Sequence, residues 1–182
     1  SFGEDFDYII LHETAHEWWG NSVTAKDMAD LWIHEGFATY SEALYVEHLN
    51  GYDAYLDYLR FYSMTIKNKR PLVGPKGVNY FNFKDGDIYT KGALTLHSLR
   101  SLINDDDLFM NMIKGFVVNN RMGMVETQDF TDWVNKQTGT DYNWFFEQYL
   151  YDRHAPQFQY YVQYNEKGNK TKFVYRWVDT QD

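Results

Sequence analysis

The feature that most constrains the fold is the motif His-Glu-Thr-Ala-His at residues 12–16, followed by Glu35 after eighteen intervening residues. On a helix, residues four apart are offset by about 40° around the axis and about 6 Å along it. His12 and His16 therefore project from one face and can share a metal ion at about 2.0–2.1 Å. Glu13 lies about 100° further round, where it misses the ion but can reach a water beside it. The motif thus requires a helix.

Two histidines leave a zinc ion under-coordinated, so a third ligand is needed. Glu35 lies near the start of a second predicted helix and can supply it if that helix packs antiparallel to the first. We therefore predict one Zn²⁺ bound by His12, His16 and Glu35, with the fourth position open for water and Glu13 as general base. The bare motif also arises by chance, but burying two imidazoles and a carboxylate without a partner is costly. The pattern favours metal-assisted hydrolysis.

Composition excludes several other classes. The 182 residues suit one domain, or one domain and part of another, and 44% hydrophobic residues suffice for a core. The net charge is −9 and no basic cluster is present, so no nucleic-acid partner is predicted. Without cysteine the chain has no disulfide and no thiolate zinc site. No segment approaches the ~18 apolar residues of a membrane span.

The start of the chain predicts a part of a longer protein. The first residue is Ser1 rather than Met, and the motif helix begins almost at once. A targeting signal would then lie upstream, so the compartment is not predicted.

The first half is predicted to be helical. A mostly apolar helix is expected from about Asp5 to Trp19, buried on several sides, with Gly20 as its C-terminal cap. After an extended Val23-Thr24, Asp30 is expected to cap a second helix that runs to about Leu49. Further helices are expected at residues 52–69, 88–103, 106–118, 128–137 and 142–150. One long loop is expected at residues 71–87. Residues 158–164 and 172–178 alternate as strands do, and 165–169 suggest a hairpin turn between them.

Three blocks of sequence resemble the aminopeptidase N family of zinc peptidases, a gluzincin family. They are the motif at 12–16 with Trp18 and Gly20-Asn21, then Leu31-Trp32 with Glu35-Gly36-Phe37-Ala38, and finally Tyr89-Thr90-Lys91-Gly92. The resemblance runs from Phe2 to about Pro156, and the departures are Glu17, Trp19 and His34. His34 is expected to face solvent on its helix, with a place in or near the site as the alternative.

The resemblance implies a mainly α fold: the helical half of a thermolysin-like zinc peptidase catalytic domain, followed by a short C-terminal β-hairpin. The catalytic domain would cover residues 1–155 without its N-terminal part, and 156–182 would begin a β-rich C-terminal region. The upstream half of the parent protein is expected to pack on the zinc helix.

The resemblance also implies catalytic roles. Glu13 would take a proton from water and return it to the departing amine, and Tyr89 would donate its hydroxyl to the developing oxyanion. The alternative for Tyr89 is one more packing aromatic among 16 tyrosines. Lys91 is expected to be structural. Glu42 is a candidate to accept a hydrogen bond from a ligand histidine's other ring nitrogen, or else a solvated surface residue.

The parent protein is accordingly expected to bind zinc and remove N-terminal residues from peptide substrates. The family's motif that grips the substrate's amino group lies upstream of this chain, so the isolated chain is not expected to supply that specificity. The alternatives are another zinc hydrolase on the same scaffold, such as an endopeptidase or epoxide hydrolase, and a non-catalytic interaction domain. The presence of both Glu13 and Tyr89 argues against the last.

Overall fold

The structure, a computed structural model, describes residues 7–80, 82–165 and 170–178, and this part of the chain is mainly helical. Its helices are α1 (Tyr8–Ala15), α2 (Trp32–Asn50), α3 (Tyr52–Ser63), α4 (Asp87–Ile103), α5 (Asp106–Asn119), α6 (Thr127–Thr138) and α7 (Asn143–Phe146). A short 3₁₀ turn covers Met28–Asp30 and a π-helical turn covers Glu147–Tyr151. The strands are β1 (Val23–Ala25), β2 (Gly123–Val125), β3 (Gln157–Asn165) and β4 (Lys170–Val178).

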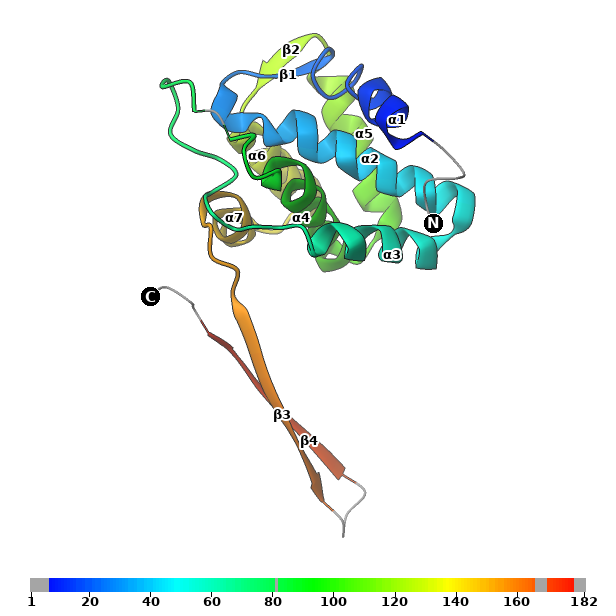
Figure 1. The fold of residues 1–182 in the computed structure, drawn as a ribbon, viewed down its shortest axis with the longest axis vertical. Helices are drawn as coiled ribbons and strands as arrows, with labels where there is room; N and C mark the ends of the chain where they lie inside the picture. The colour runs from blue at the N-terminus through cyan, green and yellow to red at the C-terminus, as the bar shows by residue number, and fades with distance from the viewer. Residues whose placement is uncertain (1–6, 81, 166–169, 179–182) are drawn as a thin grey trace.

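Helix α2 forms the centre of the helical body, with α1, α3 and α4 packed around it (Figure 1). Its sequence buries residues on several sides rather than along one stripe, as expected of a central helix. The largest of them, Trp32, Phe37 and Tyr40, are at most 2% exposed. Glu35 is therefore carried by a helix that is held by neighbours on several sides.

Helices α2 and α4 touch through a pair of glycines. A Cβ built on Gly92 would lie 2.8 Å from the Cα of Gly36, and one built on Gly36 would lie 3.0 Å from the Cα of Gly92. Carbon atoms that are not bonded prefer about 3.5–4.0 Å, so only glycine permits this approach. The contact is one residue after Glu35 and one turn after Tyr89, and it therefore sets the spacing between these two side chains.

The start of α2 differs from the sequence prediction. Asp30 does not cap α2, whose N-cap residue Leu31 makes no side-chain cap hydrogen bond. Instead Asp30 is fully buried, and its Oδ1 accepts hydrogen bonds from the backbone N–H and the hydroxyl of Thr127, at 3.0 and 2.6 Å. Trp32 Nε1 donates to the same hydroxyl at 2.8 Å. The carboxylate thus ties the start of α2 to the start of α6, a tertiary contact that local capping rules do not display.

The first helix is shorter and more exposed than expected. It ends at Ala15, its only buried residue, and His16 is the C-cap, so Gly20 lies in the turn that follows. Two of its aliphatic side chains, Ile9 and Ile10, are 54% and 65% exposed. The prediction of a helix buried on several sides is wrong for the described chain, because α1 packs on α2 along one side only (Figure 1). No helix of the described residues has the length and apolarity needed to cross a membrane.

Two strand pairs complete the fold. Strand β1 pairs with β2 in parallel, from Val23 opposite Gly123 to Ala25 opposite Val125. Strands β3 and β4 form the expected antiparallel hairpin, which extends away from the helices (Figure 1), with Phe158 opposite Trp177. The predicted turn at 165–169 falls almost wholly outside the described residues. The mainly α fold with a C-terminal hairpin is confirmed.

Candidate metal centre

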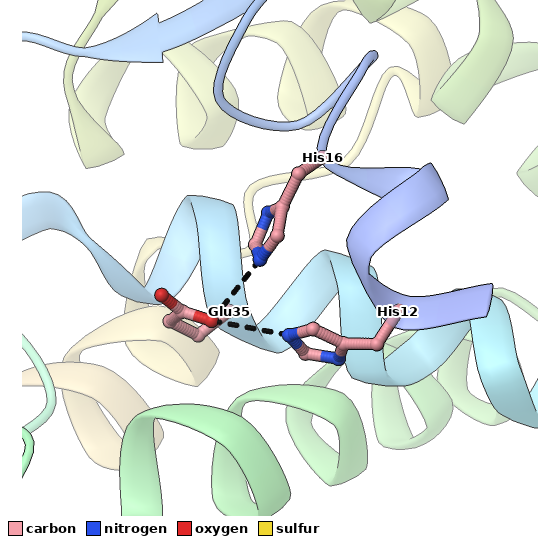
Figure 2. Close-up of side chains that lie close together, drawn as sticks. All are labelled: His12, His16 and Glu35. Carbon is pink, nitrogen blue, oxygen red and sulfur yellow. Dashed lines mark hydrogen bonds and ion pairs between the residues drawn. The ribbon is translucent and has the colours of Figure 1, made fainter. Parts of the chain in front are cut away.

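The side chains of His12, His16 and Glu35 converge between α1 and α2 (Figure 2). The Nε2 atoms of His12 and His16 lie 3.2 and 3.5 Å from Oε2 of Glu35. One possible ligand atom from each of the three residues lies within 4.8 Å of the other two. All three side chains are partly buried. The helical spacing of the motif and the antiparallel approach of α2 produce this cluster.

The cluster fits a zinc ion by its chemistry and its dimensions. Two imidazoles and one carboxylate are the ligand set of many catalytic zinc sites. Ligand atoms about 2.05 Å from a tetrahedral zinc lie about 3.3 Å from each other, close to the two histidine–glutamate distances of 3.2 and 3.5 Å. These three side chains would hold the ion, and a tetrahedral zinc would then have a fourth position for a water or substrate oxygen.

Each histidine has its second ring nitrogen held by an oxygen. Nδ1 of His12 lies 2.7 Å from Oε1 of Glu42, and Nδ1 of His16 lies 3.0 Å from the carbonyl oxygen of Trp19. Because a carboxylate and a carbonyl only accept, both Nδ1 atoms carry the proton. With only that proton on the ring, each Nε2 would present its electron pair to the centre, the tautomer that a metal requires.

The surroundings of His12 favour a positive charge. Burial lowers the pKa of His12, but the hydrogen bonds and negative charges of Glu35 and Glu42 raise it further, to about 9. Two carboxylates on opposite edges of the His12 ring therefore favour a positive charge there, and a metal cation at Nε2 would supply it in place of the second proton.

A cleft of about 340 Å³ opens beside the ligands. Besides the three ligands it is lined by Tyr8, Ile9, Glu13 and Tyr89. Glu13 is exposed on α1, and the ring of Tyr89, on α4, is centred 5.8 Å from that of His12. The two predicted catalytic residues thus face the same cleft as the ligands.

Tyr89 is held in its protonated form. Burial first, then the negative charges of Glu35 and Glu13, raise the pKa of Tyr89 to about 12. Its hydroxyl therefore remains a hydrogen-bond donor at neutral pH, and it can stabilise negative charge that develops on an oxygen in the cleft.

Two further residues of the sequence blocks serve the structure. His34 is not solvent-facing: its Nε2 accepts a hydrogen bond from the backbone N–H of Ala25 at 2.7 Å. Burial lowers the pKa of His34, which keeps the ring neutral. The hydrogen bond from Ala25 occupies its Nε2. Lys91 is buried and donates to the carbonyl oxygen of Asp152 at 3.2 Å, which agrees with a structural role.

Sequence reasoning missed Tyr58 and Tyr62, which both donate to Glu42. Their spacing of four places them on one face of α3. Among 16 tyrosines that signal is too common to single them out.

Comparison with known proteins places this geometry in context. The chain is similar to the tricorn protease-interacting factor F2 of Thermoplasma volcanium, with 26% identity over 174 residues, covering 91% of this chain and 22% of that protein. It is also similar to human aminopeptidase N, with 34% identity over 110 residues, covering 54% of this chain and 11% of the relative. The chain thus spans less than a quarter of the length of either relative.

Solved structures give the same result. An M1 zinc metallopeptidase from Deinococcus radiodurans superposes with a TM-score of 0.71 at 28% identity, over 84% of this chain and 35% of that one. Legionella pneumophila aminopeptidase A shares the fold, with a TM-score of 0.74 at 22% identity, over 94% and 19% of the two chains. The Peptidase family M1 domain matches residues 3–149, which include every ligand and cleft residue described above. The chain therefore belongs to peptidase family M1.

Proposed function

We propose that His12, His16 and Glu35 bind one zinc ion, and that this chain carries the catalytic centre of an enzyme that removes N-terminal residues from peptides. The observation that carries the proposal is the convergence of the three ligand atoms beside a cleft that Glu13 and Tyr89 also line. Family membership supports a zinc peptidase. Relatives named as aminopeptidases support the narrower activity.

The chain's residues divide the chemistry among them. Bound zinc would supply Lewis acidity, which polarises a carbonyl and lowers the pKa of water. Glu13 accepts a proton from the attacking water and passes it to the nitrogen of the departing amine, so that it is unchanged after one cycle. Tyr89 donates its O–H to the carbonyl oxygen as negative charge develops there.

The general-base role is tested on the full-length protein with an aminoacyl anilide as substrate. Glu13→Gln removes the base and should lower kcat about 10²–10⁴-fold with the zinc content unchanged. Glu17→Gln is the matched control, because Glu17 is exposed one turn further along and does not line this cleft. Undiminished turnover in Glu13→Gln would remove Glu13 from this role.

The same substrate tests the oxyanion role and the specificity. Tyr89→Phe removes one hydroxyl and should lower kcat about 10²–10³-fold. A peptide with an acetylated amino terminus should resist cleavage. If the acetylated peptide is cut as fast as the free one, the enzyme is an endopeptidase and not an aminopeptidase.

We further propose that the catalytic domain covers residues 1–155 and that 156–182 begin a β-rich region. The family match ends at residue 149, the last helical turn ends at Tyr151 and β3 begins at Gln157. Limited proteolysis should cut between these elements. Cleavage confined to other segments would contradict the boundary.

We also propose that an upstream part of the parent protein covers the outer face of α1. The exposed Ile10, which does not line the cleft, supports this, because burial of apolar surface gains about 25 cal/mol per Å². Labelling of Ile10→Cys in the full-length protein should be slower than labelling of Lys114→Cys, which lies on exposed α5 surface. Equal rates would show that the face is open.

A further inference from the structure

The carboxylate of Glu42 is buried at the meeting point of three helices. Its side chain comes from α2 and is only 3% exposed. Oε1 lies 2.7 Å from Nδ1 of His12 on α1. Oε2 accepts hydrogen bonds from the hydroxyls of Tyr58 and Tyr62 on α3, at 2.5 and 2.7 Å. The two oxygens thus have separate partners, with a ligand histidine on one and two phenols on the other.

The two phenols act as donors to one acceptor. Each hydroxyl has a single proton, and both protons are directed at Oε2 of Glu42. The 3.0 Å separation between the hydroxyl oxygens of Tyr58 and Tyr62 is then the spacing of two donors on a shared acceptor. Burial and the charge of Glu42 raise the pKa of both phenols, which keeps them protonated.

The two phenols supply hydrogen bonds that the buried carboxylate of Glu42 needs. A buried carboxylate needs hydrogen bonds to stay ionised and in one orientation, and the bond to His12 satisfies only Oε1. Without the phenols, Oε2 would lack both compensation and a fixed direction. With them, Oε1 is aimed at Nδ1 of His12, which turns Nε2 toward Glu35.

We propose that Tyr58 and Tyr62 are positioning residues for the metal centre, which act through Glu42 and His12 to set the affinity for zinc. This inference rests on the proposed zinc site and adds α3 to the elements that control it. Neither tyrosine lines the cleft formed by the ligands, so neither is a catalytic residue.

The test measures zinc dissociation constants by competition with a chromophoric chelator, on full-length Tyr58→Phe, Tyr62→Phe and the double variant. Loss of a direct partner of a ligand typically weakens metal binding 10–100-fold. Each single variant keeps one donor on Oε2, so we expect roughly 3- to 10-fold weaker binding, below that range. The double variant leaves Oε2 without either phenol, and its loss should exceed the product of the two single losses.

Tyr55→Phe is the matched control. Tyr55 is a fully buried tyrosine on the same helix, but its hydroxyl contacts Tyr40 and His97 rather than Glu42. A purely structural effect of losing a buried hydroxyl from α3 would weaken zinc binding in this variant too. We expect the zinc affinity of Tyr55→Phe to stay within about twofold of that of the unmodified protein. Loss of a direct partner of a ligand would weaken binding at least about 10-fold.

A second background keeps the test decisive if the double variant does not fold. In Glu42→Gln protein, adding Tyr58→Phe should leave the zinc affinity unchanged, because the route through the carboxylate is already broken. An equal loss in both backgrounds, or unchanged affinity in both single variants, would overturn the inference. If the unmodified protein binds no zinc, the proposed metal site itself fails, which is a distinguishable result.

Discussion

The contact between Gly36 and Gly92 makes a sharp prediction for Gly92→Ala. The new methyl would lie 2.8 Å from a backbone atom of α2, about 0.7–1.2 Å closer than carbon atoms prefer. Because the obstacle is backbone, the helices themselves must separate, and we place the overpacking cost near the upper limit of about 3 kcal/mol. Alanine's better helix propensity returns about 1 kcal/mol. The expected net loss is about 2 kcal/mol, or about 4–8 °C in Tm for a domain of this size.

The assay is thermal unfolding of the zinc-loaded protein, with turnover measured on the same samples. Gly36→Ala, whose methyl would meet its nearest atoms at 3.0–3.2 Å, should lose less stability than Gly92→Ala. Ser101→Ala, at an exposed position on α4, should lose none. Because α4 carries Tyr89, a displacement near 1 Å should also lower kcat about 10²-fold. A Tm equal to or above that of the unmodified protein would refute the argument from glycine contact.

The remaining predictions concern buried charge and metal. Arg100→Met should cost about 2–4 kcal/mol in urea unfolding, because buried Arg100 pairs bidentately with Glu47, whereas Arg60→Met at an exposed pair should cost under about 0.5. Burial, then the charge of Arg100, lowers the pKa of His97. Below about pH 6.5 the unfolded protein therefore binds more protons than the folded protein, so the free energy of unfolding falls as the pH falls. This loss should be larger for the unmodified protein than for His97→Gln, and equal pH profiles would contradict this. When free zinc is at a thousandfold excess over its Kd, its binding should stabilise the folded protein by about 4 kcal/mol, and chelation should lower Tm accordingly. An unchanged Tm would exclude tight binding.

Sequence alone located the helices whose ends are set locally. Helices α4 and α5 were predicted at 88–103 and 106–118, each within a residue of the observed limits. The start of α5 is marked by Asp105, whose carboxylate accepts the backbone N–H of Leu108. A left-handed Asn104 ends α4. Such signals lie within a few residues of the boundary and are visible in the sequence.

Boundaries set by distant contacts were not predictable. The third helix was expected to run to Lys69 but ends at Ser63, because the backbone N–H groups of Lys67 and Asn68 donate to the buried Asp87. Strand β2 was missed, since its three residues become a strand only by pairing with β1. In both cases the deciding partner is at least 19 residues away.

The site was more accessible to sequence reasoning than the packing around it. The helical period fixes how His12 and His16 project, and the structure brings Glu35 to them as the spacing predicted. The contact of Glu42 with His12 was one of two alternatives, and burial decides between them. The path of α3, which adds the phenols, depends on tertiary packing that no single-sequence pattern encodes.

The ligands also lie close together along the chain, and this bears on how the centre assembles. His12 and Glu35 are 23 positions apart, so joining them through a metal closes a short loop. Loop closure costs about (3/2)RT ln n, here about 3 kcal/mol, against roughly 10 kcal/mol or more from metal ligation at structural sites. The three candidate ligands all come from residues 12–35, and α4 adds only Tyr89 to the cleft. For the proposed zinc site, ligation therefore needs no residue of α4, whereas the complete cleft does.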